Sequence, residues 1–103
     1  MPATKRRKKE TFSRWDPADY LKSEEDMAAY LRACLEEAPE DPALIAAALG
    51  DIARAQGMVR LANKTGLTRE GLYKALSKDG NPSLGTVLKV LKALGLKFTP
   101  QVA

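Results

Sequence analysis

The sequence contains no histidine and only one cysteine, Cys34, among its 103 residues. Histidine is the commonest general base and metal ligand near neutral pH, so its absence removes many catalytic designs. A single cysteine cannot form an internal disulfide bond. The sequence also has no Gly-rich phosphate loop and no metal-ligand spacing. We therefore expect a protein that is not an enzyme and that holds no cofactor or metal.

Long apolar runs are absent as well. No segment approaches the roughly 20 apolar residues that a membrane-spanning helix needs, and the N-terminal residues are charged, unlike a signal peptide. The expectation is a cytoplasmic protein. Cys34 lies in an apolar helical stripe, where a small buried side chain is the simpler interpretation and a reactive thiol is the alternative.

Charge is distributed unevenly along the chain. Residues 1–22 carry seven Lys/Arg and three Asp/Glu. Residues 23–56 carry two Lys/Arg and eight Asp/Glu, whereas residues 57–103 carry eight Lys/Arg and two Asp/Glu. A chain with basic ends and an acidic middle can face a polyanion with one surface and a basic partner with another. The alternative is that each charge is merely solvated.

The length suits one small domain. Residues 1–14 contain KRRKKE and almost nothing apolar, which predicts a disordered basic arm before a single helical domain at 15–103. The arm either contacts DNA, in a minor groove or along the phosphates, or only keeps the chain soluble. Its candidate contact residues are Lys5, Arg6, Arg7, Lys8 and Lys9.

Apolar periodicity and capping residues predict an all-α fold. The sequence WDPADYL begins with a short helical turn capped by Asp16, with Trp15 and Tyr20 against the core. Five longer helices are expected from the spacing of apolar residues and from the caps Ser23, Asp41, Thr68 and Ser83. They cover 24–38, 42–56, 58–65, 68–77 and 84–94. Leu96, Phe98 and Pro100 add the pattern of a short C-terminal strand.

The stretch RLANKTGLTREGLYKAL, residues 60–76, carries two apolar stripes at helical spacing, interrupted at Gly66. Two short helices joined by a tight glycine-containing turn form a helix-turn-helix unit. In this arrangement Leu61 faces Leu72, Leu67 plugs the turn into the core, Gly66 takes the left-handed conformation and Thr68 caps the second helix.

The tail NPSLGTVLKVLKALGL extends this pattern. Residues 48–98 resemble the Cro/C1-type (Xre-like, lambda-repressor-like) helix-turn-helix family, with 57–98 as its core, and more closely the HigA-like addiction-module antidote proteins. The segment WDPADYLKSEEDMAAYLRACLEEA resembles the N-terminal extension of that subfamily, placing further helices at 15–56.

The resemblance implies a dimeric, sequence-specific DNA-binding repressor. It also implies the antitoxin of a type II toxin–antitoxin (HigBA-like) module, whose partners are double-stranded operator DNA and a small basic RelE-like (HigB-type) toxin. The alternative is a stand-alone phage or prophage regulator of the Cro/C1 type with no toxin partner.

In such families the second helix enters the major groove. The resemblance assigns base reading to Arg69, Glu70 and Lys74, flanked by Tyr73. Basic side chains can donate to guanine, and a glutamate can accept from cytosine. The alternative is a solvated helix face on which Lys74 pairs with Glu70.

Other residues around this helix are candidates for phosphate contacts, which position a protein without reading sequence. They are Thr68, Ser77, Lys78 and Asn81. Gly71 disfavours the helix, and either close approach of DNA or a neighbouring helix would account for it. The sequence departs from the wider family at Met58 and Val59. In that family the first helix of the unit often begins with polar residues that contact the DNA phosphates.

The acidic segment is the candidate toxin-binding surface, with Glu36 and Glu37 as its representatives. A toxin that cleaves RNA must attract phosphate, so its surface is basic and complementary to carboxylates.

Overall fold

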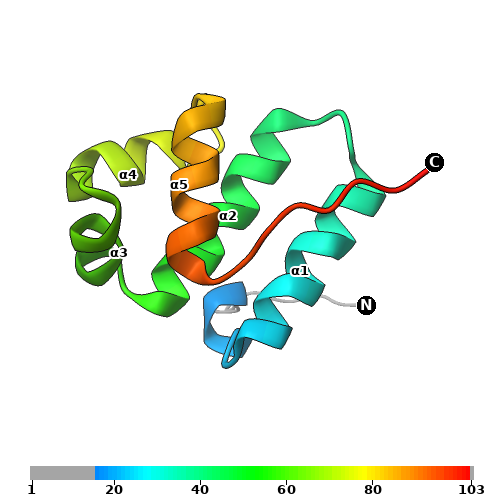
Figure 1. Cartoon of the computed structure of the whole chain (residues 1–103), viewed down its shortest axis with the longest axis horizontal. Coiled ribbons are helices and arrows are strands. Elements are labelled where there is room, and N and C mark those ends of the chain that lie inside the picture. The colour runs from blue at the N-terminus through cyan, green and yellow to red at the C-terminus, as the bar shows by residue number, and fades with distance from the viewer. Residues whose placement is uncertain (1–15, 103) are drawn as a thin grey trace, which may run out of the picture.

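The computed structural model describes residues 16–102, and every regular element within that range is helical (Figure 1). The elements are one short 3₁₀ helix and five α-helices: η1 (Pro17–Tyr20), α1 (Glu24–Glu37), α2 (Pro42–Gln56), α3 (Met58–Thr65), α4 (Arg69–Ala75) and α5 (Leu84–Leu94). The prediction of an all-α fold with five helices is confirmed for this range. The predicted basic arm, residues 1–14, and Trp15 lie outside the described residues.

Side-chain oxygens cap the N-terminal ends of all the described helices except α3, whose N-cap is Gly57; at these ends the backbone N–H groups have no intrahelical acceptor. The caps predicted at Ser23, Asp41 and Ser83 are all formed, each with an oxygen-to-nitrogen distance of 3.1 Å. The carboxylate of Asp26 also accepts the N–H of Lys22, at 3.0 Å. The local capping chemistry therefore begins the helices where the sequence pattern expects them.

α2 lies at the centre of the fold. Leu49 and Ile52 are completely buried, and the small residues Ala46, Ala48 and Ala53 are at most 2% exposed. Small side chains let neighbouring helices approach closely, and a helix that is apolar all round belongs in the interior. α1, η1 and α3 all pack on α2, while α5 stands between α1 and the α3–α4 pair (Figure 1).

A polar cluster joins η1 and α1 to α2. The Tyr30 hydroxyl donates to Asp51 at 2.5 Å, and the Arg54 guanidinium lies 3.0 Å from Asp51 and 2.6 Å from Asp16. Burial raises the pKa of Tyr30, and the hydrogen bond to the Asp51 carboxylate raises it further. The pKa of Asp16 is lowered, first by the hydrogen bond from the N–H of Ala18 and then by Arg54. The cluster thus fixes the N-terminal elements against the central helix.

The position predicted for Tyr20 is wrong, because its side chain is 60% exposed. η1 is a single turn without buried residues, and the next residue, Leu21, enters the core instead, at 8% exposure.

The C-terminal strand is also wrong for the described residues, since 96–102 form no strand. A strand needs a neighbouring strand for its hydrogen bonds, and the segment passes only helices. Its beginning is held by the end of α5. Gly95 has φ 78°, its N–H donates to the carbonyl of Lys92 at 3.1 Å, and the N–H of Leu96 donates to the carbonyl of Leu91 at 2.9 Å. This Schellman-type ending directs the tail, residues 96–102, across α1 (Figure 1).

Gly50 marks the closest approach of α2 to the end of α4. A Cβ at this position would lie well inside van der Waals contact of the carbonyl oxygen of Leu76, and a main-chain oxygen cannot rotate away. We expect Gly50→Ala to lower the free energy of unfolding by about 1–3 kcal/mol, despite the better helix propensity of alanine. Urea denaturation followed by circular dichroism measures the change.

Gly85→Ala, in α5, is the matched control. Its added Cβ would lie 3.8 Å from the Ser83 hydroxyl, an ordinary contact. This variant should be as stable as the wild type or more stable by up to about 1 kcal/mol. Equal stability of Gly50→Ala and the wild type would contradict the close packing of α2 against α4.

Candidate functional site

α3 and α4 are joined by a tight turn at Gly66. This residue has φ 76° and ψ 9°, the left-handed conformation that glycine adopts without steric cost. The Thr65 hydroxyl donates to the carbonyl of Leu61 at 2.9 Å, and its oxygen accepts the N–H of Leu67 at 3.3 Å. The prediction for Gly66 is confirmed, and Thr65 is a second turn-forming residue that the sequence analysis missed.

The two helices share the core of the molecule. Leu61 and Leu72 are 2% and 0% exposed and belong to the same hydrophobic cluster, and Leu67 packs against that cluster from the turn. The inward positions predicted for these three residues are therefore confirmed. Because both helices are anchored by buried leucines, the opposite face of α4 is held in a defined orientation.

The residues assigned to DNA contact lie on α4 and next to its two ends. Seven of them are exposed and one, Ser77, is half-buried. The exposed residues are Thr68, Arg69, Glu70, Tyr73, Lys74, Lys78 and Asn81. Tyr73 is 49% exposed, so it offers an aromatic surface beside the charged groups. The structure thus brings the predicted residues together on and directly after one short helix.

Glu70 and Lys74 do not neutralise each other. Of the residues described, only Arg54 forms ion pairs, with Asp16 and Asp51, so the predicted alternative of a Glu70–Lys74 pair is not formed. α4 therefore offers separate cationic donors and a carboxylate acceptor. Such groups can match the donor and acceptor pattern of base edges in a major groove.

Two hydroxyls at the ends of α4 differ in what they can offer a phosphate. Thr68 Oγ1 accepts the N–H of Gly71 at 3.0 Å, which leaves its own proton able to donate. The Ser77 hydroxyl instead donates to the carbonyl of Lys74 at 3.0 Å. Ser77 must rotate before it can donate to a phosphate, whereas Thr68 need not.

Of the two explanations offered for Gly71, the structure tests packing against a neighbouring helix, and close approach of DNA stays a prediction. A Cβ on Gly71 would lie 2.8 Å from Thr68 Oγ1, and no atom of another helix comes within 4 Å of it. Packing against a neighbouring helix is therefore excluded as the cause.

At the beginning of α3, Met58 is buried at 7% exposure and Val59 is 57% exposed. Met58 belongs to the hydrophobic core, which explains why a polar residue is absent from that position. The α3 end of the surface therefore has no polar side chain at either residue for holding a phosphate.

The acidic surface lies away from α4. Glu36 and Glu37 are exposed in the last turn of α1, which contains no basic residue. Carboxylates at the C-terminal end of a helix face the negative end of its dipole, which costs about 0.3–1 kcal/mol each. Cys34, one turn earlier, is half-buried, and burial raises the pKa of its thiol, so the described environment does not favour a reactive thiolate.

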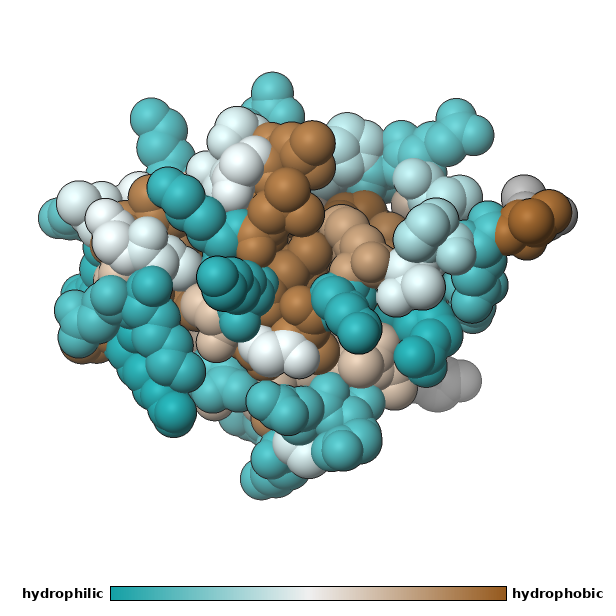
Figure 2. Space-filling model, in the orientation of Figure 1, coloured by the Kyte–Doolittle hydropathy of each residue, from teal (hydrophilic) through white to brown (hydrophobic). Residues whose placement is uncertain are grey.

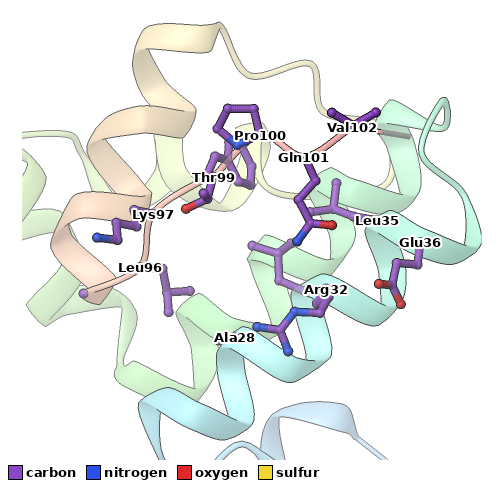
Figure 3. Close-up of a pocket in the computed structure, with 13 residues that line it drawn as sticks. Ala28, Arg32, Leu35, Glu36, Leu96, Lys97, Thr99, Pro100, Gln101 and Val102 are labelled. Atoms are coloured by element: carbon purple, nitrogen blue, oxygen red, sulfur yellow. The ribbon is translucent and has the colours of Figure 1, made fainter.

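Glu36 also borders a groove between α1 and the tail, with a volume of about 880 Å³ (Figure 3). Sequence reasoning missed this groove because it joins two segments far apart in the chain. Within the described range no group of His, Cys, Asp and Glu residues could hold a metal ion. Among those same residues, no helix is both long and apolar enough to cross a membrane.

The contact between Gly71 and Thr68 predicts a coupling between two substitutions. Thr68→Ala removes the cap and should cost about 1 kcal/mol. Gly71→Ala should gain little in the wild type, because its Cβ displaces the capping hydroxyl. In the Thr68→Ala background the same change should stabilise by about 1 kcal/mol through helix propensity. Urea denaturation of the four chains measures this, and equal effects of Gly71→Ala in both backgrounds would refute the coupling.

Comparison with known proteins identifies the family. The family model for "Probable addiction module antidote protein" matches residues 11–102. An uncharacterised protein of Haemophilus influenzae is 50% identical over 92 residues, covering 89% of this chain and 93% of that protein. No solved structure matches this chain. The match over nearly the whole length shows that the chain belongs to the family of probable addiction module antidote proteins.

Proposed function

We propose that this antidote is a sequence-specific DNA-binding repressor of the Cro/C1 type, and that it neutralises a small basic RelE-like toxin as the antitoxin of a HigBA-like module. The observation that carries the DNA-binding part is the exposed polar face of α4, which begins directly after the Gly66 turn. The proposed form is a cytoplasmic homodimer on an inverted repeat. No catalytic step, cofactor or metal is part of the proposal.

The surface chemistry of α4 supports DNA as the ligand. Arg69 and Lys74 can donate to guanine, and Glu70 can accept from cytosine, and all three are exposed on α4. Residues 57–103 carry eight Lys/Arg against two Asp/Glu, so the surrounding surface attracts phosphate. Thr68, Lys78 and Asn81 flank the helix as phosphate contacts in this proposal, with Ser77 joining them after rotation of its hydroxyl.

The toxin-binding part is supported by the charge of α1. An antidote family implies a toxin as partner, which favours this proposal over a stand-alone phage regulator. Glu36 and Glu37 occupy a helix end where they oppose the helix dipole, and no described residue forms an ion pair with them. A contribution to toxin docking would account for carboxylates at a position where they cost stability.

Lys74 and Lys78 allow base reading and phosphate contact to be separated. We expect Lys74→Ala to weaken binding to the promoter DNA of its own gene by about 1–3 kcal/mol, with little effect on scrambled DNA. Lys78→Ala should weaken binding to both DNAs about equally, because a phosphate contact carries no sequence information. Fluorescence titration with the two duplexes at one fixed salt concentration measures both effects.

If Lys74→Ala weakens both duplexes to the same extent, Lys74 does not read bases. If the wild-type chain binds neither duplex at low salt, the proposed DNA-binding function is wrong.

Glu37 gives the cleaner test of the toxin-binding surface, because Glu36 also lines the groove. We expect Glu37→Lys to slow association with the proposed basic RelE-like toxin by about threefold to tenfold at low salt, since complementary charge mainly accelerates encounter. Stopped-flow or surface plasmon resonance kinetics measure the rate. Glu25→Lys, an exposed charge reversal in the first turn of the same helix, is the matched control.

The two variants should differ in toxin association and should both retain DNA binding. Equal association rates of Glu37→Lys and the wild type would exclude this end of α1 from the docking surface.

A further inference from the structure

The tail, residues 96–102, takes part in almost no hydrogen bonds. The N–H of Leu96 donates to the carbonyl of Leu91 at 2.9 Å. Within the described range, residues 97–102 form no hydrogen bond and no ion pair, and all six are exposed. Main-chain N–H and C=O groups normally have partners in a folded protein. In the tail these groups are available to water or to another chain.

The path of the tail is extended. It crosses α1 without a helix or a turn (Figure 1). Pro100 fixes its own φ angle and disfavours a helical conformation at Thr99. Leu96, Phe98 and Pro100 carry the alternation that predicted a strand. The tail thus lacks only a neighbouring strand, and an unpaired strand is a template for pairing with another chain.

Pro100 determines which edge of the tail can pair. In a strand the N–H and C=O of one residue point to the same edge, and those of the next residue point to the opposite edge. On the edge of the even-numbered residues, Pro100 has no N–H, and the N–H of Leu96 is already bonded. The other edge is formed by Lys97, Thr99 and Gln101, whose N–H and C=O groups have no partner among the described residues. We call it the pairing edge.

Apolar surface lies next to the tail. Figure 2 shows an apolar column along α5, where Leu84 and Leu88 are 70% and 51% exposed. The groove, of about 880 Å³, adds Leu35 of α1 and Phe98 of the tail. When a strand is added to an edge, main-chain hydrogen bonds supply affinity, and neighbouring pockets receive alternate side chains. The surroundings of the tail offer apolar surface for such side chains.

We propose that the tail pairs, through the pairing edge, with an exposed β-strand of the toxin and so adds a strand to the edge of the toxin's sheet. The ligand is defined by its chemistry: a main chain whose N–H and C=O groups are unpaired at a sheet edge. This pairing rests on the proposed function, since it requires a toxin, and it adds the means by which the toxin is held.

The tail reaches the surface assigned to the toxin. Gln101 and Val102 line the groove together with Glu36, which lies in the last turn of α1 (Figure 3). A strand paired with the tail therefore continues the docking surface proposed for Glu36 and Glu37. DNA has no strand edge to offer, and α4 lies across α5 from α1 (Figure 1).

A basic toxin can approach the tail because the contact consists of uncharged main-chain groups. Lys97 is the only residue of 96–102 with an ionisable side chain. Complementary charge, such as that of Glu37, mainly accelerates encounter. Hydrogen bonds that form after encounter mainly slow dissociation. The two steps of toxin binding thus depend on different residues and can be measured separately.

Kinetics of toxin binding by the full chain test the pairing edge. Gln101→Pro removes one N–H from this edge, and Val102→Pro, the matched control, removes one from the opposite edge. We expect Gln101→Pro to speed dissociation of the proposed basic RelE-like toxin about threefold to tenfold, with a nearly unchanged association rate. Val102→Pro should dissociate like the wild type. Both residues are exposed and lie outside the helices, so both variants should remain folded.

Amide hydrogen exchange, followed by NMR on the isotope-labelled full chain, tests the edge directly. In the free chain the amides of Lys97, Thr99 and Gln101 should exchange fast, because no described group accepts their hydrogens. In complex with unlabelled toxin these three amides should slow by about tenfold or more. Phe98 and Val102 should continue to exchange fast, because their N–H groups point to the opposite edge. A tail that the toxin merely covers would not show this alternation.

Each outcome decides the proposal. Equal dissociation of Gln101→Pro and the wild type, or a complex in which the amides of the pairing edge stay fast, would overturn the pairing and leave the toxin-binding function intact. Protection of these amides in the free chain at raised concentration would assign the edge to a second copy and overturn the pairing as well. A wild type that does not bind the toxin contradicts both the toxin part of the proposed function and the pairing. Titration of the same chains with promoter DNA reports on the proposed DNA function independently.

Discussion

The fold depends on the burial of α2 on nearly all sides. Leu49 and Ile52 fill the centre, and Ala48, Gly50 and Ala53 keep the helix thin enough for its neighbours to pack closely. The acidic N-terminal helix and the basic helix pair that follows thus share one core rather than forming two units. A larger side chain at one of these small positions of α2 would displace both the N-terminal helix and the helix pair, because protein interiors are packed so densely that little room is left.

A shared core turns the uneven charge of the sequence into separate surfaces. The carboxylates of Glu36 and Glu37 lie at the end of α1, whereas Arg69 and Lys74 lie on α4, across α5 from α1 (Figure 1). Charges on opposite sides of a small protein interact weakly at physiological salt, since the Debye length is about 8 Å. An acidic and a basic surface can therefore coexist on one chain without neutralising each other, and each can attract a ligand of opposite charge.

Sequence reasoning succeeded where the determining contacts are local. Asp41, Thr68 and Ser83 cap helices through bonds that reach only three residues, and Gly66 turns the chain through its own φ angle. It failed where the partner is distant. The groove forms between α1 and the tail, which are far apart in the chain. The alternating apolar residues Leu96, Phe98 and Pro100 predicted a strand, but the described range contains no other strand with which it could pair.

The end of α5 connects the local and the distant parts of this structure. Gly95 takes φ 78° and turns the chain back, a left-handed conformation that residues with a side chain rarely adopt. The turn sets the path of the tail over α1 and thereby forms the groove. α5 itself packs on α3, which positions α4 through the Gly66 turn. One helix thus links the groove to the proposed DNA face. Because the proposed repressor binds an inverted repeat as a homodimer, its affinity for the operator includes the free energy of dimer formation, so the protein concentration controls occupancy of the operator as well as neutralisation of the toxin.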